Sequence, residues 1–118
     1  MRARLFCPVG DLKGSSFEIH GEAVIGRSAE SSIVLASRSV SGRHARIAFD
    51  SEQGHFLLED LGSLNGTQLD GAPVKGKETL GALHVITLGG KHELIFQDLG
   101  MFPLAAVPPE EGTMEVGS

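Results

Sequence analysis

Three short polar segments contain side chains that can bind a phosphate group, and apolar stretches separate them. The first holds Arg27, the second Ser41 and the third Asn65. An arginine guanidinium presents a fixed fork of charged N–H donors, a serine hydroxyl donates one further bond, and an amide both donates and accepts. Each hydrogen bond to an ionised phosphate contributes about 1.5–3 kcal/mol, more than a bond between neutral groups. We therefore expect these residues to determine the function if the fold brings them together.

The charge distribution favours a compact anion as ligand. The chain of 118 residues has a net charge of −5, which argues against non-specific binding to nucleic acid or to an anionic membrane. The segment 26–46 contains four arginines and one acid, Glu30, so it carries +3 and the remainder carries −8. A basic island on an acidic body suits a single phosphate better than a polyanion. We expect neither nucleic acid nor a membrane as partner.

The cysteine content and the hydropathy indicate the cellular compartment in which we expect the protein. The single cysteine, Cys7, cannot form an internal disulfide and lies in an apolar stretch, so we expect it in the core and the protein in a reducing, cytoplasmic compartment. No apolar run approaches the ~18 residues of a membrane-spanning helix.

Short apolar runs between glycine-rich turns predict an all-β fold. Ala45, Ile47 and Phe49 alternate with more polar neighbours, which is typical of a strand with one buried face. Asp70-Gly71 and Gly89-Gly90 each predict a hairpin turn. No window has a helical period beyond two turns. The predicted strands are Arg4–Val9, Phe17–Ile19, Val24–Ile25, Ile33–Leu35, Ala45–Phe49, Phe56–Glu59, Thr67–Leu69, Ala72–Val74, His84–Leu88 and His92–Gln97.

The composition changes near residue 100, where prolines and Glu110-Glu111 replace the alternating pattern. We expect one domain over residues 1–98 and a flexible tail over residues 99–118. Thr113, in an acidic setting within that tail, is a candidate phosphorylation site that could place the tail in a phosphate-binding pocket. A disordered end without regulatory role is the alternative.

Four fragments in a fixed order carry a family resemblance. They are Gly26-Arg27, Ile33-Val34-Leu35, the run Ser-Gly-Arg-His-Ala-Arg-Ile from Ser41 to Ile47, and the run Asp-Leu-Gly-Ser-Leu-Asn-Gly-Thr from Asp60 to Thr67. This order resembles the forkhead-associated (FHA) domain, a reader of phosphothreonine peptides. The resemblance implies a two-sheet β-sandwich of about ten to eleven short, mostly antiparallel strands. It also implies a partner phosphorylated by a Ser/Thr kinase in signalling, and no cofactor or metal.

The resemblance assigns roles to individual residues. Arg27 and Ser41 would bind the phosphate, and Asn65 would hold the peptide main chain. Departures from the family pattern are Gly42, where a polar side chain is common, and Leu64, where a small hydroxyl residue is common. Ser39 and Arg43 could partly substitute for the lost contacts. Residues expected to support the site without touching the ligand are Gly26, His44, Ser63, Gly66 and Thr67.

An enzyme and a phosphate-independent module are the two competing function classes. An enzyme would need Ser41 and His44 as nucleophile and base, but a spacing of three residues in a loop does not indicate a catalytic triad, and no phosphate-binding P-loop or zinc-protease motif occurs. We therefore expect no catalysis. A phosphate-independent scaffold or oligomerisation module on the same fold stays open as the alternative, supported by Gly42 and Leu64.

Overall fold

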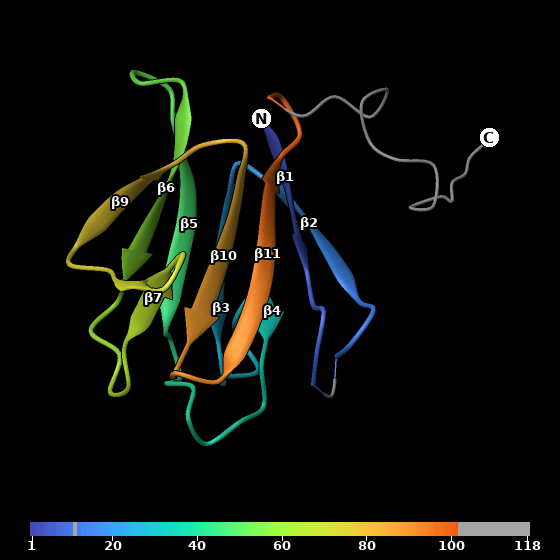
Figure 1. Cartoon of the computed structure of the whole chain (residues 1–118), viewed down its shortest axis with the longest axis vertical. Helices are drawn as coiled ribbons and strands as arrows, with labels where there is room; N and C mark the ends of the chain where they lie inside the picture. Colours follow the sequence, from blue (N-terminus) through green and yellow to red (C-terminus); the bar gives the residue numbers. More distant parts are fainter. Residues whose placement is uncertain (11, 102–118) are drawn as a thin grey trace.

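The molecule consists of two β-sheets packed face to face (Figure 1). The computed structural model describes residues 1–10 and 12–101, and that part of the chain contains eleven strands and no helix. The strands are β1 (Arg2–Phe6), β2 (Ser16–His20), β3 (Glu22–Gly26), β4 (Ile33–Val34), β5 (Ala45–Asp50), β6 (His55–Asp60), β7 (Thr67–Leu69), β8 (Ala72–Pro73), β9 (Lys77–Leu80), β10 (Leu83–Leu88) and β11 (His92–Asp98). The predicted all-β sandwich is confirmed.

The strand order explains how distant segments become neighbours. One sheet has the order β2-β1-β11-β10-β7-β8 and the other β4-β3-β5-β6-β9. The pairing is antiparallel except between β3 and β4, which run parallel. Because β1 pairs with β11, Leu5 lies opposite Phe96, and the N-terminal strand closes onto the last strand of the domain.

The core lies between the sheets and is almost wholly apolar. Phe56 on β6 and Phe96 on β11 are both fully buried and meet edge to face, with ring centroids 5.8 Å apart, so this pair joins the two sheets. Ala45 and Ile47 are buried as the alternation predicts, and Phe49 packs against the core from its rim. Cys7 is also buried, as expected.

The predicted turns are confirmed, and the strand limits differ in places. Asp70 and Gly71 both have positive φ, as a tight two-residue hairpin requires. The first strand ends at Phe6 instead of Val9, because Pro8 lacks an N–H for the ladder. Strand β9 was not predicted: its sequence Lys-Glu-Thr-Leu is polar, and only Leu80 is buried. It lies at a sheet edge, where three of its side chains remain partly or fully accessible.

The loops that carry the predicted site lie at one end of the sandwich. Figure 1 shows the β3–β4, β4–β5 and β6–β7 loops at the lower end together with the β10–β11 turn, while the N-terminus and the β5–β6 turn lie at the upper end. Residues Leu99–Met101 form a turn after β11, and Met101 N–H donates to the carbonyl of Asp98. The rest of the predicted tail, including Thr113, lies outside the described residues.

Candidate functional site

The end of β3 and the β4–β5 loop contact each other through their backbones. The N–H of Arg27 donates to the carbonyl of Ser41 at 2.9 Å, and the N–H of Ser28 donates to the carbonyl of Gly42 at 3.1 Å. Gly26 makes this approach possible, because a Cβ there would lie 2.1 Å from the Gly42 carbonyl oxygen. Arg27 is exposed, and its guanidinium has no ion-pair partner among residues 1–10 and 12–101. It is thus available to an external anion.

Ser41 joins the β4–β5 loop to the β6–β7 loop. Its hydroxyl oxygen accepts the backbone N–H of Leu64 at 3.0 Å. An accepting hydroxyl keeps its own proton free to donate. Ser41 can therefore hold the two loops together and still offer a hydrogen bond to a ligand.

His44 braces the same two loops from inside. It is fully buried, its Nδ1 accepts the N–H of Ser41 at 3.0 Å, and its Nε2 lies 2.8 Å from the carbonyl oxygen of Gly66. Since a carbonyl only accepts, Nε2 carries the proton and donates. The nitrogen that a catalytic base would turn toward a serine hydroxyl is occupied by a backbone N–H. This arrangement does not form a nucleophile–base pair.

A carboxylate holds the β6–β7 loop rigid. Asp60 Oδ1 accepts the hydroxyl groups of Ser63 at 2.6 Å and Thr67 at 2.7 Å, and Oδ2 accepts the N–H groups of Gly62 and Ser63. Burial opposes ionisation of Asp60, but these hydrogen bonds together lower its pKa. Gly66 completes the loop with φ of +87° and donates its N–H to Ser63 Oγ. The motif residues thus shape the loop that presents Asn65.

Asn65 lies next to the β4–β5 loop and is exposed. Its Nδ2 donates to the carbonyl of Ser39 at 3.2 Å, which leaves the second N–H and the side-chain oxygen for a ligand. Leu64 is 87% exposed, and its backbone N–H is held by the Ser41 hydroxyl. Arg43 is exposed and Gly42 half-buried in the adjacent loop. The fold therefore brings all the predicted ligand-binding residues to one end of the sandwich.

Sequence patterns do not reveal that Gly89 and Asp60 support the site. The sequence predicts only a turn at Gly89. A Cβ there would lie 2.2 Å from the carbonyl oxygen of Ser39, and the Gly89 N–H donates to the Gly66 carbonyl at 2.9 Å. The β10–β11 turn therefore supports both recognition loops. The motif from Asp60 to Thr67 does not by itself identify Asp60 as the residue that organises the loop. The signal for Asp60 was its position three residues before Ser63 and seven before Thr67, two hydroxyl donors.

Two negative findings concern the described residues alone. Residues 1–10 and 12–101 contain no group of three histidine, cysteine or acidic side chains placed to hold a metal ion. That part of the chain also has no helix of the length and hydropathy needed to cross a membrane.

The segment that carries these loops matches a known family. The family model of the FHA domain matches residues 23–89, a range that contains every site residue from Gly26 to Gly89. The chain belongs to the FHA domain family. Among solved structures, an FHA domain from a structural and functional study of phosphothreonine-dependent FHA domain interactions has a TM-score of 0.71 at 32% identity. The superposition covers 83% of this chain and 97% of the related chain, so the similarity includes the whole sandwich.

The curated relatives are longer than the segment that this chain matches. The FHA domain-containing protein FhaB of Mycobacterium tuberculosis is 41% identical over 66 residues, which are 55% of this chain and 41% of FhaB. Mediator of DNA damage checkpoint protein 1 of Rattus norvegicus is 35% identical over 82 residues, which are 70% of this chain and 6% of that protein. The matched segment thus spans less than half of either relative.

Proposed function

We propose that this FHA domain binds phosphothreonine-containing segments of a partner protein and acts as an interaction module in signalling rather than as an enzyme. Family membership and the solved relative studied for phosphothreonine-dependent interactions support the proposal. The observation that carries it is the bond from Leu64 N–H to Ser41 Oγ, which joins the loops bearing Ser41 and Asn65. The backbone bond from Arg27 to Ser41 brings in the third loop.

The available donors and acceptors suit different parts of the phosphopeptide. The exposed guanidinium of Arg27 supplies positive charge and two or more N–H groups to the phosphate, and the free proton of the Ser41 hydroxyl supplies another bond. Asn65 uses its remaining N–H and its side-chain oxygen to pair with a peptide N–H and carbonyl. Ser39, Arg43 and the backbone of Gly42 provide further polar contacts around the phosphothreonine. Leu64 offers an apolar contact instead of a hydroxyl.

Residues expected to support the site act through the loops. His44 and Gly66 hold the two loops at a fixed separation, and Ser63 and Thr67 shape the β6–β7 loop through Asp60. Gly26 permits the close backbone approach at the end of β3. A site assembled before the ligand arrives loses less entropy on binding.

The biological setting is part of the proposal. We place a Ser/Thr protein kinase upstream, because it would create the phosphothreonine that the site reads. The reducing cytoplasm suits a chain whose single cysteine, Cys7, is buried and unpaired. We assign recognition to a domain of residues 1–98, whose last strand, β11, ends at Asp98.

The proposal is tested with two peptide libraries of random sequence, identical except that one carries phosphate on a fixed central threonine. We expect the phosphorylated library to bind at least about tenfold more tightly, as one charge-assisted contact alone would provide. Equal binding of both would contradict the proposal. It would instead favour phosphate-independent docking, for which the exposure of Leu64 is the supporting observation.

A further inference from the structure

The outer face of the six-stranded sheet carries a row of apolar side chains. Phe6 on β1 pairs with Ile95 on β11, and Ile95 pairs with Val85 on β10, so the three lie side by side on adjacent strands (Figure 1). Leu83 lies on the same face, two residues before Val85. Val85 is 37% and Leu83 is 53% exposed, while Phe6 and Ile95 are half-buried. Single apolar residues are common on a surface, but these four neighbours form a continuous patch.

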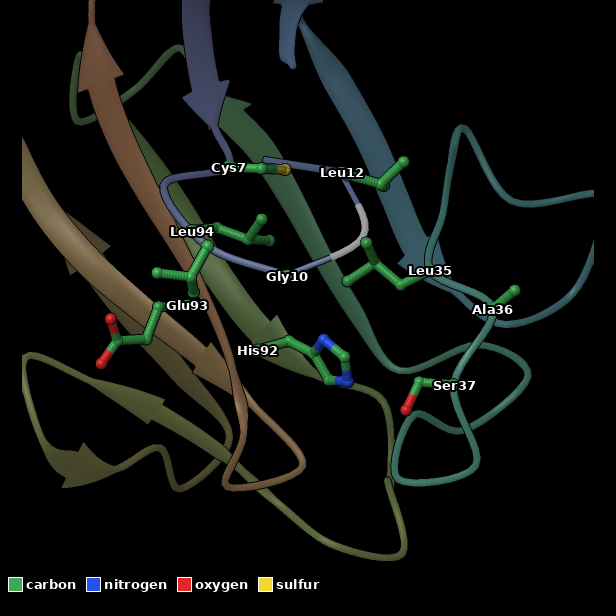
Figure 2. A pocket seen from close by; sticks show the side chains of 10 residues that line it. Cys7, Gly10, Leu12, Leu35, Ala36, Ser37, His92, Glu93 and Leu94 are labelled. Atoms are coloured by element: carbon green, nitrogen blue, oxygen red, sulfur yellow. The ribbon is translucent and has the colours of Figure 1, made fainter. Parts of the chain in front are cut away.

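The inner side chains of the same strands show which way the row points. Leu94 and Cys7 belong to the buried core and line a hollow on the inner side of the sheet (Figure 2). Leu5 is fully buried on that side as well. Successive residues of a strand point to opposite faces, so Phe6 and Ile95 point away from the core. The row therefore has no covering layer in the described part of the chain.

Opposite charges flank the row. On one flank, Arg4 lies two residues before Phe6, and its guanidinium donates to the side-chain oxygen of Gln97 on the neighbouring strand. On the other flank, Glu93 is exposed, two residues before Ile95. Within the described residues, Arg4 has no carboxylate partner and Glu93 has no cationic partner. The face thus presents a positive and a negative group on opposite sides of an apolar centre.

A second copy of this face matches both charges. Sheets that pack face to face lie about 10 Å apart with their strands nearly aligned, and a two-fold dimer uses the same patch on both copies. A two-fold axis along the row from Phe6 to Val85 sets each apolar residue of the row against its own copy and reverses the flanks. Glu93 of one copy then lies over Arg4 and Gln97 of the other copy, and this contact occurs twice.

We propose that this protein forms a two-fold dimer through the outer face of the six-stranded sheet, with the apolar row at its centre and two Glu93–Arg4 ion pairs beside it. Removal of the row from water drives the association, and the ion pairs fix its orientation. The charges favour a second copy as the occupant, because one surface supplies both signs at matching positions. The loops assigned to the phosphothreonine lie at the lower end of the sandwich in Figure 1, so the dimer does not depend on the proposed function.

Sedimentation equilibrium of the full chain between about 1 μM and about 1 mM measures the association. We expect wild-type protein to dimerise within this range. Val85→Glu should weaken the association at least about tenfold, because each dimer would bury two added carboxylates. Val34→Glu is the matched control: it makes the same change at a site of the other sheet that is 39% exposed, and it should leave the association unchanged. Urea unfolding checks that each variant is folded.

Charge reversal tests the orientation of the two copies. Arg4→Glu and Glu93→Lys should each dimerise more weakly than wild type when alone, because each brings like charges together. An equimolar mixture of the two variants should dimerise with about the wild-type affinity. In the mixed dimer the new glutamate faces the new lysine, and the native Arg4 faces the native Glu93. A mixture that associates no better than the separate variants would overturn the two-fold arrangement.

Two further results would overturn the proposal. A wild-type chain that stays monomeric at every concentration would exclude a second copy and leave this face to a different protein or to residues 102–118. A dimer that Val85→Glu weakens no more than Val34→Glu does would place the interface elsewhere on the molecule.

Discussion

The hydroxyl oxygen of Ser41 accepts the backbone N–H of Leu64 at 3.0 Å across 23 positions of sequence. This bond joins the β4–β5 and β6–β7 loops through the group assigned to the phosphate. The nearby N–H of Ser41 is held by His44, so both the backbone and the side chain of this serine are fixed before a ligand arrives. Binding and loop structure therefore depend on the same residue.

Arg27→Ala separates binding from folding. We expect phosphopeptide affinity to fall about 10- to 100-fold, because a charge-assisted contact is removed. The free energy of unfolding should change by less than about 0.5 kcal/mol, since the guanidinium is exposed. Isothermal titration and urea unfolding measure the two quantities. Arg2→Ala, at the opposite end of the sandwich, is the matched control, and full binding by Arg27→Ala would place the phosphate elsewhere.

His44→Ala should act through stability. The substitution leaves a cavity in a fully buried position, removes the partner of Ser41 N–H, and removes one of the two hydrogen bonds to the Gly66 carbonyl, which keeps the bond from Gly89 N–H. We expect a loss of about 3 kcal/mol in the free energy of unfolding, together with weaker phosphopeptide binding. His20→Ala, at an exposed position, should cost less than about 0.5 kcal/mol. Equal stability of the two variants would disprove the bracing role.

Gly89→Ala tests the support given by the β10–β11 turn. Gly89 and Gly90 both have positive φ, so alanine costs about 1 kcal/mol or more at either position. Only at Gly89 would the new Cβ meet the Ser39 carbonyl, 2.2 Å away, while at Gly90 no atom lies within 4 Å. We expect Gly89→Ala to be the more destabilising and to weaken phosphopeptide binding. Identical effects of both variants would show that the contact with Ser39 is unimportant.

Asp60 should make the free energy of unfolding depend on pH under acidic conditions. Its pKa is lower in the folded protein than in the unfolded chain, so the ionised carboxylate stabilises the fold. This contribution is complete above the unfolded pKa of about 3.9 and disappears as the pH falls through the lower folded pKa. Between about pH 6 and about pH 2, the free energy of unfolding measured in urea should fall less for Asp60→Asn than for wild type. Parallel curves for the two proteins would exclude Asp60 as the source.

The sequence predicted most strands because burial alternates along them. Ala45 and Ile47 face the core, and their spacing alone identifies the buried face. Strand β9 was not predictable, because an edge strand with one buried residue, Leu80, shows no alternation of apolar and polar residues. The binding roles of Arg27, Ser41 and Asn65 stay predictions, to be decided by the experiments above.

The sequence by itself determined the residue types at the site, the all-β fold and the turn positions, since local periodicity and turn chemistry are encoded in neighbouring residues. Only the tertiary structure decided which distant groups meet. Leu64 N–H reaches Ser41, and Gly89 supports Ser39. These contacts follow from how the two sheets pack and place their loops at one end. No pattern within a single segment can show that arrangement.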